Sequence, residues 1–398
     1  MIAPPRLSTC AIAIALSVAA APRPAAAQSA GEVFDATTLH EVRLLINSKD
    51  QQLLRANFTE NTYYPADMVW GSERVRNVGV RSRGAGSRNG VKLGLRIDFD
   101  RYTSDQRFAG LSSLVLDNLL QDPSMVREQV SMAFFNRIGV PAPRESFCRL
   151  FINNEYQGVY ALVEEIEPEF VDRTLGEDDG YLFEYHWVAP FRGEDLGTLG
   201  AYKPLFEARN HESDSDNMLY GSISDLFREA ATTDATTRER IERFLDVPSF
   251  ITLIAAENFL AENDGLLGYA GMNNLYMYRF TGTTRQRFLP WDKDNTFLQI
   301  DFPILSRLDD NVLSRQLLAF EDLRAQYFDT LAACARAAAE EDWLLNEITR
   351  SSALIADAAH QDTRKLFSNE EFDAGVEFVK TFAAERPPFV LTSVAGVR

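Results

Sequence analysis

Cysteine and histidine are scarce in this chain, which has three cysteines and four histidines among its 398 residues. Cys10 lies in the apolar N-terminal stretch, so only Cys148 and Cys334 remain elsewhere. Two cysteines are too few for a disulfide scaffold or a structural zinc site. The sequence leaves open whether they form one disulfide or stay as two buried thiols. Because Asp and Glu are abundant, any functional metal is expected to be a hard cation such as Mg, Mn or Ca.

Long apolar runs are lacking after the N-terminal region, so we expect no integral membrane segment in the mature chain. Positive charge is also in deficit, because 40 Lys and Arg residues stand against 58 Asp and Glu residues, for a formal net charge of -18. An acidic surface disfavours contact with the phosphates of bulk DNA or RNA. Nucleic acid is therefore not an expected partner, although a local basic site for a nucleotide remains compatible with this charge.

The first 27 residues have the pattern of an export signal. Arg6 supplies the positive charge, residues 11–21 are apolar and small, and residues 25–27 form an A-x-A cleavage site. The apolar run is too short to span a bilayer comfortably. We therefore expect cleavage after Ala27 and a periplasmic, extracellular or cell-surface location.

Strand patterns come first and helical patterns last, which predicts an α+β fold with two lobes. Residues 28–40 have the composition of a linker. Residues 41–163 are expected to form a β-rich N-terminal lobe with one helix, capped by Asp122 and ended by Gly139. Residues 164–398 are expected to form a mainly helical C-terminal lobe.

A glycine-rich connection follows the strand pattern at residues 75–83 and carries Gly84 and Ser87 beside Arg83. Such loops let backbone N–H groups approach phosphate oxygens, which Lys or Arg then neutralises. Lys92 and Arg96 follow at an even spacing, so on a strand both would point to one face.

Glu128 lies on the expected helix of the first lobe. It could pair with Lys92 and hold that side chain toward a phosphate, as the equivalent glutamate does in kinases. A surface hairpin and a solvated helical glutamate are the structural alternatives for these residues.

The chain from Pro248 to Glu262 is almost wholly apolar and predicts a buried helix that ends at Asn263-Asp264-Gly265. An aspartate held in such a turn can orient a hydroxyl nucleophile and accept its proton. Asn273 or Asn274, just before the next strand pattern, could ligate a hard cation.

Asp292 and Asp294 follow the strand pattern at residues 286–289 in the segment Pro-Trp-Asp-Lys-Asp. Carboxylates at a strand end suit a Mg ion that bridges nucleotide phosphates. A polar turn is the structural alternative.

Taken together, these clusters resemble the CotH family of atypical protein kinases over roughly residues 40 to 300. The segments that carry the resemblance, in the order of the family, are Val80 to Gly84 with Ser87, Lys92, Arg96 to Phe99, Leu114 to Asn118, Asp122, Arg127, Ile152 to Tyr160, Glu164, Asn263-Asp264, Asn274 to Tyr276, and Pro290 to Asp294. The Trp-Asp-x-Asp segment is the most specific of them.

The resemblance implies a two-lobed, kinase-like fold that uses ATP and Mg or Mn to phosphorylate protein substrates. It implies that Asp264 is the catalytic aspartate and that Asp292 and Asn274 are metal ligands, with Asp294 beside them. Lys92 or Arg96 would be the phosphate-binding cation. Glu164 and Glu165 would lie near the link between the lobes, and Glu164 would contribute to the nucleotide site. The sequence departs from typical kinases because Asn274 comes ten residues after Asp264, and neither His-Arg-Asp nor Asp-Phe-Gly occurs.

The function expected from the resemblance is that of an exported, ATP-dependent protein kinase. One alternative is a noncatalytic exported surface or matrix protein that keeps the fold for binding. Another is a phosphoryl or nucleotidyl transferase that acts on a glycan or small molecule, because phosphoryl transfer depends mostly on positioning and charge neutralisation.

Overall fold

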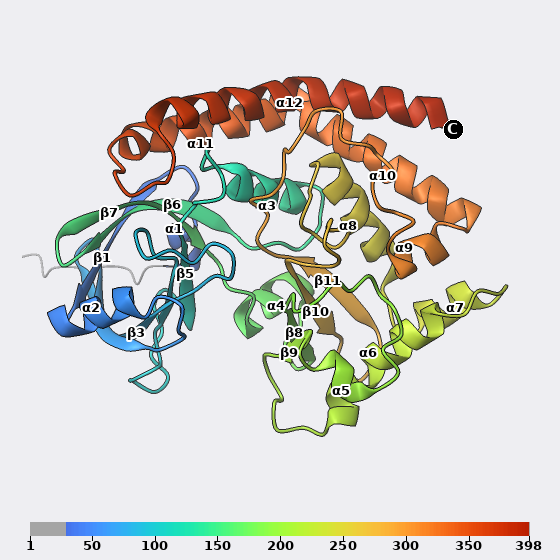
Figure 1. The fold of residues 1–398 in the computed structure, drawn as a ribbon, viewed down its shortest axis with the longest axis horizontal. Coiled ribbons are helices and arrows are strands. Elements are labelled where there is room, and N and C mark those ends of the chain that lie inside the picture. The colour runs from blue at the N-terminus through green and yellow to red at the C-terminus, as the bar shows by residue number, and fades with distance from the viewer. Residues whose placement is uncertain (1–28, 398) are drawn as a thin grey trace, which may run out of the picture.

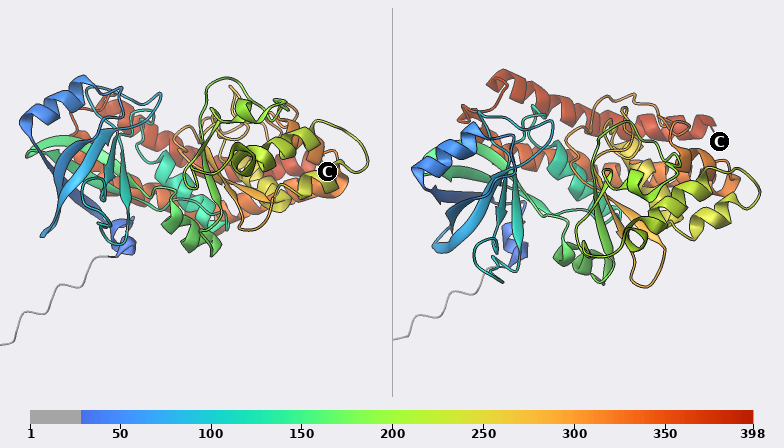
Figure 2. Two further views of the ribbon diagram at one scale, coloured as in Figure 1. Left: turned by 90° about the horizontal axis from the view of Figure 1, so that it is seen from below. Right: turned by 60° about the horizontal axis from the view of Figure 1, so that its bottom comes forward.

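The structure is a computed structural model that describes residues 29–397, so the expected export signal lies outside the described residues. A β-rich lobe and a larger, mainly helical lobe lie side by side (Figure 1). Figure 2 shows the same two lobes from two further directions, with the C-terminal helices running along both. The expected α+β, two-lobed architecture is confirmed.

The N-terminal lobe is a closed barrel with the strand order β1-β2-β3-β4-β5-β7-β6. Parallel pairing of β1 with β6 closes the barrel, and the other neighbouring strands pair antiparallel. Its strands are β1 (Leu39–Ile46), β2 (Tyr64–Trp70), β3 (Glu73–Ser82), β4 (Leu95–Asp98), β5 (Ser113–Asp117), β6 (Glu145–Ile152) and β7 (Glu155–Val163). Asn153 and Asn154 join β6 to β7 with φ of 50° and 66°, the backbone of a tight hairpin turn.

Residues 29–40 of the expected linker are instead part of the barrel lobe. They contain α1 (Ala30–Val33) and the start of β1, and Val33 is fully buried in the barrel core. A further helix, α2 (Ser48–Ala56), lies on the barrel surface and buries only Leu54. The lobe therefore holds more helices than expected, because neither segment has the apolar repeat by which a helix is recognised.

The helix between the lobes, α3 (Arg127–Arg137), begins later than the sequence predicts. Its N-cap residue is Val126 rather than the expected Asp122, but Oδ2 of Asp122 accepts the backbone N–H groups of Val126 and Arg127, both at 2.8 Å. Gly139 follows the helix with φ of 81°, as expected of a residue that ends one.

The C-terminal lobe contains a four-stranded sheet with the order β11-β10-β8-β9, surrounded by helices. The strands are β8 (Tyr181–Tyr185), β9 (Phe206–Ala208), β10 (Leu275–Arg279) and β11 (Gln286–Pro290). The helices are α4 (Pro168–Leu175), α5 (Leu199–Tyr202), α6 (Asp216–Ala230), α7 (Thr237–Glu242), α8 (Val247–Phe259), α9 (Val312–Leu317), α10 (Glu321–Ala339), α11 (Trp343–His360) and α12 (Asn369–Val397). Within the described residues, none of these helices combines the length and the apolar character that a bilayer span needs.

The apolar α8 is buried as its sequence predicts, apart from Pro248, Ser249 and Thr252 in its first two turns, and a residue of the last helix holds its C-terminal end. The Arg386 side chain is fully buried and donates to the carbonyls of Asn258 and Phe259 at 2.6 and 2.9 Å. It also donates to the carbonyls of Ile300 and Phe302, at 2.8 and 2.7 Å. Carbonyl groups in the last turn of a helix lack hydrogen-bond donors within the helix, and Arg386 provides donors for two of them.

Apolar side chains form two cores, one inside the barrel and a larger one that runs from the outer face of the barrel through the C-terminal lobe. Cys148 belongs to the first core and Cys334 to the second, and both are free, buried thiols. Of the two alternatives, the structure therefore has two buried thiols and no disulfide between Cys148 and Cys334.

Candidate active site

One face of the barrel wall is turned toward the C-terminal lobe. On β5 and β7, Val115 and Val163 belong to the core shared with that lobe, whereas Leu116 and Leu162 belong to the core inside the barrel. Because side chains alternate along a strand, charged residues in step with Val115 and Val163 also face the cleft between the lobes. Polar side chains from both lobes therefore meet in this cleft.

The β10–β11 hairpin brings Asn274 and Asp292 together. Leu275 pairs with Pro290, so the residues just outside this pair lie at the same end of the sheet. The backbone N–H of Trp291 donates to the carbonyl of Asn274 at 3.1 Å. Asn274 and Asp292 both have left-handed backbones, with φ of 53° and 51°, a conformation that clusters at functional sites in folded proteins.

Asp264 lies in the turn after α8, where two asparagine side chains hold it. Its Oδ2 accepts from Nδ2 of Asn273 at 3.1 Å and from Nδ2 of Asn274 at 3.2 Å. Burial raises the pKa of Asp264, and the hydrogen bond from Asn273 opposes that rise. The carboxylate is therefore fixed in place, and the amide oxygens of both asparagines are directed away from it. The choice between Asn273 and Asn274 as a cation ligand stays open.

Lys293 joins this turn to the segment that carries Asp292. Its fully buried Nζ is 2.9 Å from Oε1 of Glu257 on α8 and donates to the carbonyl of Asn274 at 3.1 Å. The α8 helix, the Asp264 turn and the end of β11 are thus held as one unit. Sequence reasoning noted Lys293 within its motif but assigned it no role.

Asp292 and Asp294 add two carboxylates to the same place. Burial and the neighbouring Asp117 raise the pKa of Asp292 to about 6. Asp294 accepts from Nε2 of Gln121 at 3.0 Å, which ties this segment to the chain leading into α3. Partly buried carboxylates beside an amide oxygen are the donor set that Mg²⁺ and Mn²⁺ prefer, so these residues fit a hard divalent cation.

The glycine-rich loop brings Arg83 over the same segment. The Arg83 guanidinium lies 5.3 Å from the ring centre of Trp291 and makes no hydrogen bond or close ion pair within residues 29–397. Burial works against its charge, but Glu165 and Asp117 outweigh that effect and raise the pKa of Arg83. Gly84 has φ of 105°, which a residue with a side chain rarely adopts. Arg83 is thus a cation available for a phosphate, which fits a nucleotide.

Ser87 lies in the same loop, next to Gly84. A Cβ atom added at Gly84 would lie only 2.5 Å from the Ser87 hydroxyl. The position of the Ser87 side chain therefore leaves room for glycine but not for a larger residue at position 84. The backbone carbonyl of Ser87 accepts from Nδ2 of Asn118 at 2.9 Å, which anchors the loop to the end of β5.

Lys92 does not lie where the sequence predicts. It precedes β4, so strand alternation does not place it beside Arg96. Its Nζ is fully buried, 2.7 Å from Oδ2 of Asp362, and 5.1 Å from the ring centre of Tyr160. Asp362 follows α11, so this ion pair ties the barrel to the C-terminal helices. The structure thus corrects the expected pairing of Lys92 with Glu128, whereas the expected contact of Lys92 with phosphates stays a prediction that the buried ion pair disfavours.

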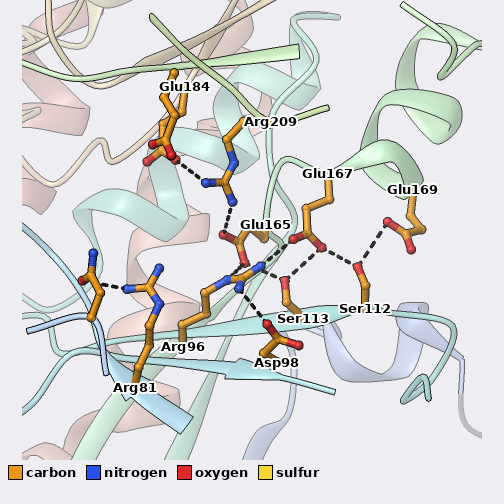
Figure 3. Close-up of polar contacts among 12 residues, drawn as sticks. Arg81, Arg96, Asp98, Ser112, Ser113, Glu165, Glu167, Glu169, Glu184 and Arg209 are labelled. Atoms are coloured by element: carbon orange, nitrogen blue, oxygen red, sulfur yellow. Dashed lines mark hydrogen bonds and ion pairs between the residues drawn. The ribbon is translucent and has the colours of Figure 1, made fainter. Parts of the chain in front are cut away.

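Arg96 does face the cleft, but carboxylates surround it (Figure 3). Its guanidinium nitrogens lie 2.6 Å from Glu165, 2.6 Å from Glu167 and 3.2 Å from Asp98. The group borders a cavity of about 330 Å³. Since three carboxylates already balance its charge, Arg96 is a poorer phosphate ligand than Arg83.

Glu164 also has a different environment from the expected one. Its oxygens lie 2.6 Å from Arg144 and 2.5 Å from Arg173, so the side chain is fixed in an ion-pair network beside α4. The next residue, Glu165, takes the opposite side of the chain and binds Arg96. Of the two glutamates expected near the link between the lobes, Glu165 therefore faces the cleft, whereas Glu164 does not.

Sequence reasoning assigned no role to two further acidic residues of the cleft: Asp117, which lies in the segment Leu114 to Asn118 of the resemblance, and Glu145. Asp117 ends the apolar strand β5, and Glu145 opens the apolar strand β6. A single acidic residue at the end of a buried strand is the only sequence signal for either. That signal is weak, because many strand ends carry such a residue for solubility.

The chain is similar to several known proteins. A family model described as CotH kinase protein matches residues 80–390. The inner spore coat protein H of Bacillus subtilis is 23% identical over 64% of this chain and 68% of its own length. An inner spore coat protein H-like protein of the same bacterium is 34% identical over 56% of this chain and 61% of its own length. Among solved structures, the Helicobacter pylori proinflammatory kinase CtkA aligns with a TM-score of 0.31 at 12% identity, over 80% of this chain and 95% of that one.

Proposed function

Because this chain belongs to the CotH kinase family, we propose that it is an exported kinase that transfers the γ-phosphoryl group of ATP to Ser or Thr hydroxyls of a protein. ATP and Mg or Mn are the proposed cofactors. The observation that carries the proposal is the meeting of Asp264, Asn274 and Asp292 at one end of the β10–β11 hairpin, opposite Arg83. The proposed location is outside the cytoplasm.

Each residue has a separate proposed role. Asp264 would orient the acceptor hydroxyl and take its proton, because its carboxylate is already held by two amides. Asp292, Asp294 and the Asn274 amide oxygen would hold the divalent cation, which supplies charge neutralisation at the phosphates. Arg83, with Gly84 and Ser87, would contact phosphate oxygens from the barrel side.

The test combines calorimetric titration of ATP in Mg or Mn with a phosphotransfer assay on a generic acceptor protein. Asp292→Ala should weaken cation-dependent ATP binding. Asp264→Asn should leave binding nearly intact but lower turnover by about 10² to 10⁴. Arg83→Ala should weaken binding of ATP more than of adenosine. Asp309→Asn, an exposed carboxylate outside the cleft, is the matched control and should behave as wild type.

The outcomes separate the competing functions. If the wild-type protein binds no nucleotide with either metal, the kinase proposal fails and a noncatalytic binding protein takes its place. If ATP binds and is consumed but no protein acceptor is labelled, a transferase acting on a glycan or small molecule is the better description.

A further inference from the structure

Three potential metal ligands meet on one face of the sheet in the C-terminal lobe. Glu184 lies near the end of β8, His186 directly follows that strand, and Glu207 lies in the middle of β9. One ligand atom from each of these side chains lies within 4.8 Å of the other two. A small adjustment of the side chains would bring all three atoms to about 2.0 to 2.2 Å from one ion, the usual length of bonds from a metal to nitrogen or oxygen.

The pairing of the two strands fixes this arrangement. Glu184 pairs directly with Glu207 across β8 and β9, so both side chains project from the same face of the sheet. His186 shares that face because it is two residues beyond Glu184. Its backbone N–H donates to the carbonyl of Leu205 at 2.8 Å, which continues the pairing past the end of β8. The opposite face, which carries Phe183, packs into the core of the C-terminal lobe.

The charges on this face favour a bound cation. Two like charges directly opposite each other, as in Glu184 and Glu207, destabilise a pair of strands. The Arg209 guanidinium lies 3.5 Å from Glu184 and is shared with Glu165, at 3.8 Å (Figure 3). Both distances exceed the length of about 2.7 to 2.9 Å of a strong charge-assisted hydrogen bond. One shared arginine therefore compensates the two carboxylates only in part.

The closest contact in the group joins His186 to Glu207. Nε2 of His186 lies 2.6 Å from Oε2 of Glu207, and the two side chains are 42% and 53% exposed. Without a metal, a proton between the ring nitrogen and the carboxylate holds this pair together. A divalent ion competes with that proton, because metals bind the deprotonated forms of both groups. The exposure of both side chains gives a dissolved ion direct access.

We propose that Glu184, His186 and Glu207 bind a divalent transition-metal ion, with Zn²⁺ as the preferred occupant. Imidazole nitrogen suits Zn²⁺, and a given set of nitrogen and oxygen ligands generally binds Zn²⁺ more tightly than Mn²⁺. The histidine distinguishes this site from the proposed phosphotransfer site on the neighbouring strands, whose ligands are all oxygen atoms. Because β9 is a three-residue strand at the edge of the sheet, the ion would fasten it to β8.

The experiment uses the full chain, stripped with EDTA and free of nucleotide. Zn²⁺, Mn²⁺ and Mg²⁺ are titrated separately by calorimetry, and thermal unfolding is recorded with and without each ion. Wild type should bind Zn²⁺ more tightly than Mn²⁺, and Zn²⁺ should raise its unfolding temperature. His186→Gln and Glu207→Gln should each weaken Zn²⁺ binding at least about tenfold, since loss of even an indirect partner of a metal ligand has an effect of that size.

Two control variants test whether the loss is specific to these ligands. His360 forms a similar pair with Asp373, at 2.9 Å and with side chains 40% and 61% exposed, but it belongs to no group of three such ligands within residues 29–397. His360→Gln should therefore bind Zn²⁺ as wild type does. Asp292→Ala should also keep the Zn²⁺ affinity of wild type, because Asp292 belongs to the proposed phosphotransfer site.

A nuclear magnetic resonance readout identifies the ligand directly. The chain has four histidines, so their ring signals are few. Zn²⁺ should shift the ring signals of one histidine, and those signals should be the ones missing from the spectrum of His186→Gln.

Absence of Zn²⁺ binding by wild type, or full Zn²⁺ affinity in both His186→Gln and Glu207→Gln, overturns the inference and leaves a hydrogen-bonded pair of His186 and Glu207 as the explanation. Neither outcome affects the proposed kinase function, which ATP titration tests independently.

Discussion

Replacement of Lys92 distinguishes a structural ion pair from a phosphate ligand. Its Nζ lies 2.7 Å from Asp362, and both side chains are completely shielded from water. Lys92→Met removes one charge and leaves the other buried without its partner. Loss of one member of such a pair typically costs about 3 to 5 kcal/mol. Because each 1.4 kcal/mol is about a factor of ten, the unfolding equilibrium should shift by more than about a hundredfold.

A double variant tests the electrostatic part of this loss. Asp362 also accepts backbone N–H groups from Val159 at 3.1 Å and from Arg364 at 2.9 Å. Asn at this position keeps a carbonyl oxygen for one of these donors but carries no charge. The double variant Lys92→Met with Asp362→Asn should therefore be more stable than Lys92→Met alone, because no uncompensated charge remains buried.

Urea unfolding followed by tryptophan fluorescence and circular dichroism measures these free energies. Lys203→Met is the control, because Lys203 forms an ion pair of similar length with Asp216 but on the exposed surface. That change should cost less than about 1 kcal/mol. Calorimetry on the folded Lys92→Met protein should give the same ATP affinity as wild type. Unchanged stability together with lost ATP binding would refute the structural assignment and restore Lys92 as a phosphate ligand.

Three further changes have expected outcomes. Gly158→Ala should destabilise by at least about 1 kcal/mol in urea unfolding, since φ is 117° and a Cβ atom would lie 2.2 Å from the aspartate of that ion pair. His186→Gln should lower the free energy of unfolding by less than about 1 kcal/mol, and by more near about pH 5.5 than near about pH 8.5. The hydrogen bond to Glu207 raises the pKa of His186, so the stabilisation from the protonated imidazole is lost as the pH rises through that pKa. The double variant Cys148→Ser with Cys334→Ser should fold and bind ATP as wild type does, and nonreducing electrophoresis of wild type should show no internal disulfide; an oxidised band would contradict this.

Much of the site was predictable because its parts are local in the sequence. Asn274 and Asp292 flank two short strand patterns joined by a turn, and antiparallel pairing of such strands brings their outer ends together. The apolar run before Asp264 likewise predicts a rigid helix end, and α8 is buried as expected. These inferences need only strand alternation, hairpin register and helix periodicity.

The failures concern contacts between distant parts of the chain. Lys92 and Asp362 are 270 residues apart, and nothing near either residue identifies the other. The even spacing of Lys92 and Arg96 predicted that both side chains point to one face of a strand. That prediction is wrong because β4 begins only at Leu95, so Lys92 is not on the strand. Glu145 escaped notice because the local sequence does not show that its buried oxygens lack hydrogen-bond partners within the described residues.

The bond from Arg386 to the end of α8 has a consequence for biogenesis. Translation makes α8 and the Asp264 turn well before α12. Until α12 is made, the Phe259 carbonyl lacks its Arg386 donor, and the Asn258 carbonyl keeps only the backbone N–H of Ala261. The turn that carries Asp264 acquires its final support only when α12 docks. We therefore expect nascent chains that stop before Arg386 to carry a loosened Asp264 turn, so that the C-terminal lobe matures only once α12 has been synthesised.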